Sequence, residues 1–362
     1  MPHMGRIQGI QILRGIAASL VVLVHSQYGD NYNIATDLFS WSRLFEMGVD
    51  LFFVTSGFIM MLVSDPLTGR ETSPHHFLVR RIQRIVPLYW FYTLLLTFGA
   101  VLVPSILRWT TLTPSLVLKS LFFVPSFHPV DGQLHPLLAQ GWTLNYEMFF
   151  YLCFAVMIGL ALGTRVIAMA SLFVALWGLS LAVGQDTAFM AFLGNTIVFE
   201  FVAGMGLYWV YRRGWVVARA AIPAAIALPI LIWLIGSGTA APLAAGLDQI
   251  SLRCIVWGIP SLLAVYVVLA LPEMSNPVAR ALSTLGDASY SLYLCHTFVV
   301  AVVVRIWRML GHESSLAFGL LVILPCCIAV SLLSYRLIER PLIALTRRAA
   351  GILTPKPAGA GQ

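Results

Sequence analysis

The stretch LRGIAASLVVLVHSQ, Leu13 to Gln27, decides how this chain is interpreted. It belongs to an apolar run long enough to cross a membrane as a helix, yet Arg14 lies near one end and His25 near the other. An ionisable side chain at membrane depth costs several kcal/mol unless it faces protein or water. We interpret the stretch as a retained membrane helix rather than a signal peptide, because Arg14 interrupts the apolar run and no small-residue cleavage site follows.

The rest of the chain has the composition of a membrane protein. Of its 362 residues, 59% are hydrophobic and 10% are charged, and the mean hydropathy is +0.87, whereas soluble domains average about a quarter charged residues. Apolar runs of about 18 to 25 residues recur along its length, each long enough to span a bilayer as a helix. The sequence predicts an all-α, polytopic membrane helical bundle of about ten transmembrane helices. We place them at residues 10–28, 46–64, 85–103, 142–162, 166–184, 189–210, 217–236, 253–271, 288–309 and 316–338.

The basic residues predict the orientation of this bundle. Arg and Lys in short loops stay on the cytoplasmic side, and an even number of spans with cytoplasmic N- and C-termini puts most of them there. The formal charge of +7 then reflects topology and attraction to anionic membrane lipids, and no aromatic-basic pattern indicates nucleic acid. We predict one transmembrane domain over residues 1–345 and a basic, Pro/Gly/Ala-rich disordered tail over 346–362. The segment 115–125 is too short to span and is predicted to be interfacial or re-entrant.

Arg14 and His25 are predicted to share one face of the first helix. Eleven positions separate them, which is about 16 Å of rise and about 20° of rotation on an α-helix. Arg14 would lie nearer the cytoplasm and His25 nearer the outer side, at the two ends of a polar stripe. The alternative is that Arg14 snorkels to the headgroups and that His25 is an interfacial residue.

Further polar residues occur at matching depths in other predicted spans. Asp50 opens the second span from outside and Glu147 opens the fourth, so both are placed to meet His25 in the outer half of the bundle. Each alone is explained by a structural hydrogen bond or, for Glu147, by a favourable acid in the first turn of a helix. Together they predict a buried polar site. Its other predicted lining residues are Ser56, Asn145, Glu200 and His296.

The segment RRIQRIVP, Arg80 to Pro87, carries a cluster of arginines before the third predicted span. Arg81 and Arg84 stand at i and i+3, which puts two guanidinium groups on one side of a helix turn. This geometry suits bidentate binding of phosphates, with Arg80 beside them. The alternative is that the cluster only keeps a loop in the cytoplasm.

Two other groups of residues are assigned no catalytic chemistry. The segment HPVDGQLH, with His128, Asp131 and His135, is interpreted as turn chemistry, and we expect no metal site. The cysteines all lie inside apolar runs, where they behave as small hydrophobes. They are Cys153, Cys254, Cys295, Cys326 and Cys327.

Several motifs together make the chain resemble the acyltransferase-3 family of integral-membrane O-acyltransferases. They are LRGIAASLVVLVHSQ, GVDLFFVTSGFIM, RRIQRI, GWTLNYEMFFY, FEFVAG, LGDASYSLYLCHTF and SYRLIERPL. They occur in the order typical of the family and extend over almost the whole chain. The chain is most similar to the short, stand-alone members associated with exopolysaccharide modification.

The resemblance implies a ten-helix enzyme of the bacterial cytoplasmic (inner) membrane. Such an enzyme transfers an acyl group, most often acetyl, from cytoplasmic acyl-CoA to a sugar hydroxyl of an extracytoplasmic glycan or lipid-linked oligosaccharide. The implied donor is acetyl-CoA, acting as substrate with no permanently bound cofactor, and a glycan-biosynthesis complex is a further expected partner. The implied functional residues are Arg14, His25, Arg81, Arg84, Trp142 and Glu147.

A mechanism follows from the chemistry of these groups. A hydroxyl is a poor nucleophile near neutral pH, so His25 is the candidate general base, with Glu147 or Asp50 orienting its imidazole. An acyl-histidine intermediate is the alternative route. The competing functions are a glycan or lipid-linked-sugar transporter or flippase without acyl transfer, and a non-catalytic assembly partner of a glycan synthase.

Overall fold

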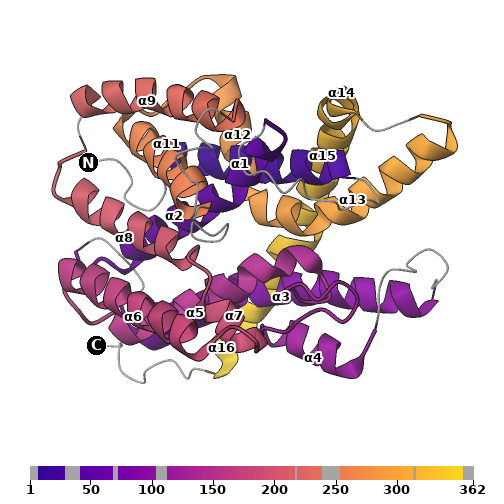
Figure 1. Ribbon diagram of the computed structural model, residues 1–362, viewed down its shortest axis with the longest axis horizontal. Coiled ribbons are helices and arrows are strands. Elements are labelled where there is room, and N and C mark those ends of the chain that lie inside the picture. Colours follow the sequence, from indigo (N-terminus) through magenta and orange to yellow (C-terminus); the bar gives the residue numbers. More distant parts are fainter. Residues whose placement is uncertain are drawn as a thin grey trace, which may run out of the picture.

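A computed structural model shows that the protein is built from helices (Figure 1). The structure describes residues 7–28, 41–67, 72–102, 112–216, 218–238, 253–312 and 315–353. Within these ranges there is no strand, only an isolated β-bridge that joins Phe127 to Leu134. The all-α architecture predicted from the sequence is confirmed.

The described helices are named in chain order. Those before residue 184 are α1 (Gln8–Tyr28), η1 (Trp41–Glu46), α2 (Met47–Ser64), α3 (Pro74–Leu102), α4 (Pro114–Leu121), η2 (Ala139–Gly141), α5 (Trp142–Met157) and α6 (Leu162–Val183). Those after it are α7 (Ala188–Leu193), α8 (Val198–Arg212), α9 (Ala218–Gly236), η4 (Cys254–Gly258), α11 (Ile259–Ala270), α12 (Pro277–Asp287), α13 (Ser289–Met309), α14 (Leu316–Phe318), η5 (Gly319–Ile323), α15 (Leu324–Ser334), η6 (Tyr335–Glu339) and α16 (Arg340–Leu353).

Seven of the described helices are long and apolar enough to cross a membrane. They are Gln8–Ser26, Leu44–Ser64, Pro74–Leu102, Leu162–Val183, Ala188–Arg212, Ser289–Met309 and Leu316–Ala349. The other three predicted spans also fall on helices, but shorter ones: α5 has 16 residues, and the apolar parts of the other two are Ala221–Ile235 and Cys254–Ala270. The protein is a multi-pass helical membrane protein, while the count of ten spans and the orientation of the termini stay predictions.

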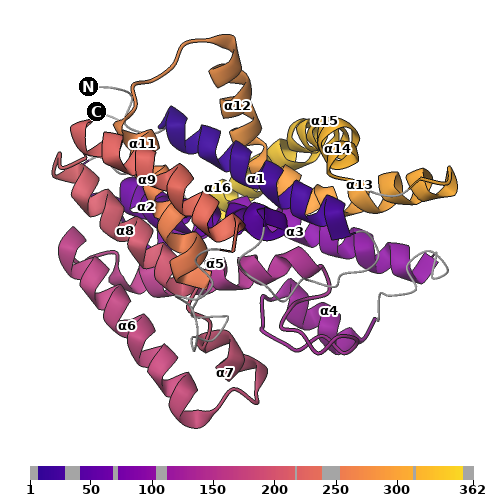
Figure 2. The ribbon, with the colours of Figure 1, turned by 45° about the horizontal axis from the view of Figure 1, so that its top comes forward.

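Helix α1 lies in the middle of the assembly (Figure 2), where it packs against α2, α11, α12 and α13. In its most apolar window 61% of the residues are buried inside the protein, against 17% for α6. Since a helix at the edge of a membrane bundle leaves its apolar side chains to the lipid, α6 is a lipid-facing helix and α1 is an interior one. The ionisable side chains of α1 therefore face protein.

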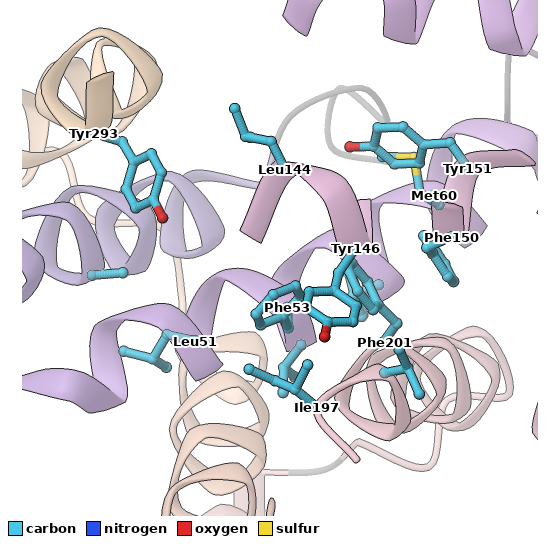
Figure 3. Close-up of a cluster of buried hydrophobic side chains, with 14 of the residues drawn as sticks. Leu51, Phe53, Met60, Leu144, Tyr146, Phe150, Tyr151, Ile197, Phe201 and Tyr293 are labelled. Carbon is cyan, nitrogen blue, oxygen red and sulfur yellow. The ribbon is translucent and has the colours of Figure 1, made fainter. Parts of the chain in front are cut away.

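Aromatic side chains anchor α5 to its neighbours, as Figure 3 shows for Phe150, Phe201 and Tyr146. The rings of Phe150 on α5 and Phe201 on α8 stack with centroids 4.3 Å apart, and those of Tyr146 and Phe192 stack at 4.1 Å. Large buried rings contribute much of the packing energy of a core. They hold α5, which carries Glu147, in a defined position.

Helices α2 and α8 meet at two glycines. A Cβ on Gly57 of α2 would collide with the backbone of Phe201, and a Cβ on Gly204 of α8 would collide with the backbone of Val54. Small residues let membrane helices approach this closely and pack in van der Waals contact. The contact holds α2, which lines the site described below, against α8.

Replacing Gly204 with valine is expected to destabilise the protein. The backbone of α2 cannot move aside as a flexible side chain would, so overpacking should cost about 1–3 kcal/mol and lower the midpoint of thermal unfolding in detergent. Gly206→Val is the matched control, because nothing lies within 4 Å of a Cβ at Gly206. Equal midpoints for the two variants would show that this helix contact is not tight.

Helix α3 begins at Pro74, well before the predicted span start at residue 85. Arg80, Arg81 and Arg84 are therefore part of a 29-residue helix rather than of a loop before it. The hydropathy pattern placed the boundary at the charged cluster, but a helix of this length extends beyond the hydrocarbon and carries charges in its first turns.

The short segment that was predicted not to span forms α4, which has 8 residues. Thr113 caps it by accepting a hydrogen bond from the N–H of Leu116 at 3.2 Å, with Pro114 at the first position. The indole N–H of Trp90 donates to the carbonyl of Leu121 at 2.8 Å and fastens α4 to α3. A helix of this length reaches about 12 Å and cannot cross the bilayer.

The predicted disordered tail begins too early at residue 346. Helix α16 continues to Leu353, and the hydroxyl of Thr346 hydrogen-bonds the carbonyls of Leu342 and Ile343. Good helix formers, arginine, leucine and alanine, fill this stretch and sustain the helix despite its basic character. The residues after Leu353 lie outside the described part of the chain.

Candidate active site

A cavity of about 200 Å³ lies between α1, α2, α3, α5 and α13. Most of its wall is apolar, and Figure 3 shows Leu144 and Tyr151 of α5 and Tyr293 of α13, which are among its lining residues. The polar lining residues are Gln11, Arg14, Ser56, Arg81, Arg84, Thr143, Glu147, Tyr151, Ser289, Tyr290 and Tyr293. The cavity therefore combines a mainly apolar wall surface with polar side chains that point at it from several helices, as ligand sites do.

Arg14 lies in the wall of this cavity. Its guanidinium donates to the hydroxyl of Ser289 at 3.0 Å and to the side-chain carbonyl of Gln11 at 3.4 Å. Only 9% of the residue is exposed, so Arg14 does not snorkel to a membrane surface. Because its described partners are neutral, its charge is available to an anionic or polar ligand.

Arg81 and Arg84 project from α3 into the same cavity, as the i, i+3 spacing predicted. Arg81 is buried and its guanidinium lies 5.6 Å from the ring of Phe77. Arg84 makes no hydrogen bond or ion pair with any residue that the structure describes. Glu339 exerts a coulombic interaction on Arg84 but forms no contact ion pair with it, so the guanidinium can still bind an anion.

A second cavity of about 450 Å³ adjoins the first, since Gln11, Arg14, Arg81 and Arg84 line both. It is strongly basic, with six arginines against two carboxylates in its lining. The arginines are Arg14, Arg80, Arg81, Arg84, Arg340 and Arg347, and the carboxylates are Asp287 and Glu339. An excess of positive charge in a concave site raises the local concentration of an anionic ligand.

Sequence analysis missed Arg340 and Arg347 as candidate site residues. They stand seven positions apart on α16, so they lie on one face of that helix, and both line the basic cavity. In sequence they looked like ordinary cytoplasmic flanking charges. The signal that points to them is the i, i+7 spacing that starts at the second arginine of SYRLIERPL, but the facing helix α3 is known only from the fold.

Glu147 also lines the first cavity, which we call the apolar cavity, together with Arg14, Arg81 and Arg84. It accepts a hydrogen bond from Ser56 at 3.1 Å and one from the hydroxyl of Tyr151. Two helices therefore hold the carboxylate in place. It does not hydrogen-bond His25, so the structure does not bring these two predicted partners together.

His25 is paired with another histidine. Its ring meets that of His296 edge to face, with centroids 4.7 Å apart. The Nδ1 atom of His25 lies 2.8 Å from the carbonyl of Val21, and because a carbonyl only accepts, Nδ1 carries the hydrogen. The Nδ1 atom of His296 is bonded in the same way to the carbonyls of Tyr293 and Leu292. Both imidazoles thus present Nε2 as the basic nitrogen.

His25 does not line the cavity, and Tyr293 connects it to the cavity wall. The ring of Tyr293 lies 6.1 Å from that of His296 and 5.9 Å from that of Phe52. Its hydroxyl donates to the carbonyl of Gln140 at 2.8 Å and hydrogen-bonds Thr143. Tyr293 therefore lies in the cavity wall and also contacts the histidine pair through His296.

Asp50 has a partner that sequence analysis did not identify. Arg253 forms an ion pair with Asp50 at 2.9 Å and with Glu46 at 3.1 Å. Asp50 is fully buried and makes no hydrogen bond to His25. The expected meeting of Asp50 with His25 is therefore wrong, because a nearby guanidinium satisfies this buried carboxylate.

The remaining predicted lining residues do not line the cavity. Trp142 packs against Phe53 and Tyr146. Asn145 is buried, and its side-chain carbonyl oxygen has no hydrogen-bond partner among the described residues. The buried carboxyl group of Glu200 lies beside Asp50 and Cys254. Among the five further lining residues predicted from the sequence, only Ser56 lies in the cavity wall. The other four are Trp142, Asn145, Glu200 and His296.

Comparison with known proteins gives a consistent result. Residues 7–336 match the family model Acyl_transf_3, described as an acyltransferase domain. The "Exopolysaccharide production protein ExoZ" of Rhizobium meliloti (strain 1021) is 37% identical over 303 residues, which is 82% of this chain and 89% of the relative. The "Putative membrane-bound transacylase BcsY" of Komagataeibacter xylinus is 27% identical over 357 residues, 92% of this chain and 82% of the relative. No solved structure matches the chain.

Proposed function

This chain belongs to the acyltransferase family of the Acyl_transf_3 model, and from that premise we propose a specific reaction. The protein transfers an acyl group, most readily acetyl, from cytoplasmic acyl-CoA to a hydroxyl of an extracytoplasmic or lipid-linked glycan such as an exopolysaccharide. The family supports acyl transfer. The exopolysaccharide in the name of one relative supports the class of acceptor.

The observation that carries the proposal is the pair of adjoining cavities, one basic and one apolar. The nucleotide phosphates of acyl-CoA carry several charges and cannot enter hydrocarbon unpaired, so they bind among the arginines of the basic cavity, which are Arg80, Arg81, Arg84, Arg340 and Arg347. The pantetheine arm then lies in the apolar cavity, with Arg14 at the junction. Cytoplasmic termini, expected from the basic residues, would open the basic cavity to the cytoplasm of the bacterial cell, at its inner membrane.

The acyl transfer is assigned to His25. Its Nε2 takes the proton of the acceptor hydroxyl while the oxygen attacks the thioester carbonyl. The C–S bond breaks as the C–O bond forms, and the proton passes from His25 to the sulfur, which leaves as the free thiol of coenzyme A. In the alternative route, Nε2 attacks the thioester carbonyl, the C–S bond breaks, and coenzyme A leaves as its thiol, so that an acyl-histidine forms. The acceptor hydroxyl then attacks this acyl group, loses its proton and forms the ester, which restores His25.

The neighbours of His25 have separate tasks in this mechanism. The carbonyl of Val21 holds the tautomer in which Nε2 is basic, so neither Glu147 nor Asp50 is required to orient the imidazole. Tyr293 lies between the cavity and the histidine pair, so a rotation of its side chain would let the thioester reach His25. Glu147 instead places a negative charge among the arginines that bind the donor.

A transporter or flippase for lipid-linked sugars is the second candidate, because polar groups inside a helical bundle also suit a permeation path. The test is purified protein in lipid vesicles supplied with radiolabelled acetyl-CoA. An acyltransferase releases coenzyme A and passes label to an added glycan or, slowly, to water. A flippase moves a lipid-linked sugar without consuming acetyl-CoA, and that result would overturn the proposal.

A further inference from the structure

The loop between α4 and η2 folds into a small hairpin outside both cavities. The backbone N–H of His128 donates to the carbonyl of Gln133 at 2.8 Å, and that of Gly132 donates to the carbonyl of His128 at 2.9 Å. Gly132 has φ +68°, a value that favours glycine and permits the tight turn. The hairpin therefore brings together His128, Asp131 and His135, which sequence analysis had assigned to turn chemistry.

The three side chains converge on one point. The rings of His128 and His135 stack with centroids 4.5 Å apart. Asp131 Oδ2 lies 2.8 Å from Nε2 of His135, and Asp131 Oδ1 lies 3.7 Å from Nδ1 of His128. One ligand atom from each residue lies within 4.8 Å of the others.

The hydrogen bonds around the cluster leave acceptors facing each other. Nδ1 of His135 lies 2.9 Å from the carbonyl of Pro136, so it carries the hydrogen and Nε2 keeps a lone pair in the neutral ring. That lone pair faces a carboxylate oxygen, which also only accepts. Nδ1 of His128 is buried and has no hydrogen-bond partner among the described residues. Something positive must stand between these atoms, either a proton or a metal ion.

We propose that His128, Asp131 and His135 bind one divalent transition-metal ion of the zinc class. Two imidazole nitrogens and one carboxylate oxygen are a common ligand set for such ions, and the backbone carbonyl that orients His135 is the usual outer partner of a metal-bound histidine. Tetrahedral bonds of about 2.1 Å put ligand atoms about 3.4 Å apart. Asp131 Oδ2 and His135 Nε2, now 2.8 Å apart, would therefore separate by about 0.6 Å, and the more distant ligand atoms, within 4.8 Å of each other, would close by up to about 1.4 Å. Asp131 is 46% exposed, which leaves room for water as the fourth ligand.

The position of the hairpin indicates what the ion does. The N–H of Leu137 donates to the hydroxyl of Ser120 on α4 at 2.8 Å. A few residues later, the side chain of Gln140 donates to Thr297 and to the carbonyl of Leu294 on α13. An ion at the hairpin would brace the connection between α4, α5 and α13, so its role is structural and independent of the proposed reaction.

The test is metal binding by tag-free, full-length protein in detergent. After treatment with a chelator and dialysis against Zn²⁺, the native protein is expected to retain one ion per chain by mass spectrometry. It should also unfold at a higher temperature than the metal-free form. Co²⁺ bound in place of Zn²⁺ should give the visible absorption of a four-coordinate site. This measurement is made on the native protein and needs no variant.

His128→Gln and His135→Gln should each weaken Zn²⁺ binding at least about 10-fold. The control is the double variant His75→Gln/His76→Gln, which removes two adjacent exposed histidines of α3. Asp131→Asn keeps the shape of the hairpin and should also weaken binding. Equal metal content in the native protein and the site variants, or loss only in the control, would overturn the proposal. So would native protein that retains no Zn²⁺ and gives no four-coordinate Co²⁺ spectrum, because a protonated histidine would then bridge to Asp131.

Discussion

His25→Ala should lower the rate of glycan acylation by about 10²- to 10⁴-fold, the range expected for loss of a general base. The protein level and membrane insertion should stay normal, because the Nδ1 hydrogen bond of His25 goes to a carbonyl of its own helix and one ring contact with His296 contributes only about 0.5–1.5 kcal/mol. The measurement is transfer of label from acetyl-CoA to glycan by purified protein. Mass spectrometry of surface glycan from cells making each variant measures the same loss in vivo.

Two further comparisons make the His25 result specific. His75→Ala removes an exposed histidine of α3 and should leave the rate unchanged. Added imidazole should partly restore activity to His25→Ala if the missing group is a base or nucleophile, and His25→Gln should remain inactive with a normal unfolding midpoint. Full activity in His25→Ala would remove this residue from the mechanism.

The double replacement Arg81→Gln/Arg84→Gln should raise the KM for acetyl-CoA by roughly 100-fold, with little change in the KM for the acceptor. A charge-assisted hydrogen bond is worth about 1.5–3 kcal/mol, and each 1.4 kcal/mol is about tenfold in affinity. The measurement is the rate of label transfer over a range of donor concentrations. Arg84→Gln alone should account for much of the effect, since Arg84 makes no hydrogen bond with any described residue.

Arg280→Gln on α12 is the matched control for this pair. It also removes one arginine, but Arg280 is exposed and lines neither cavity. Its donor KM should stay at the native value. An unchanged donor KM in the Arg81→Gln/Arg84→Gln variant would mean that this arginine cluster has a purely topological role. In that case, a reporter of the membrane side on which α3 begins would detect that the start of the helix had moved to the other side.

Local patterns in the chain were enough to predict several features of the site. Arg14, Arg81, Arg84 and Glu147 all line the apolar cavity. Their signals are local: an ionisable group inside an apolar run, and a spacing that puts two side chains on one helix face. The helical class follows from the same logic, since lipid leaves a backbone no partner outside its own helix.

Other features depend on which helices meet. The partner of Asp50 is Arg253, about two hundred positions later, and the partner of His25 is His296. Depth in the membrane can be estimated from position along a span, but rotation and neighbours cannot. For that reason Asp50 was expected to meet His25, while the arginines of α16 that face α3 were missed.

Amino-acid order alone therefore determines that this is a bundle of membrane helices with charged groups in its interior, because burial of apolar runs and the cost of a charge in lipid are properties of each segment. Tertiary packing decides which charges neutralise each other and which remain open to a ligand. A hydrogen bond needs its two atoms within about 3.5 Å, and the attraction between two buried charges weakens as their separation grows, so both depend on which helices are neighbours. The carboxylate of Asp50 and the guanidinium of Arg84 thus acquire opposite roles only when their helices are in place.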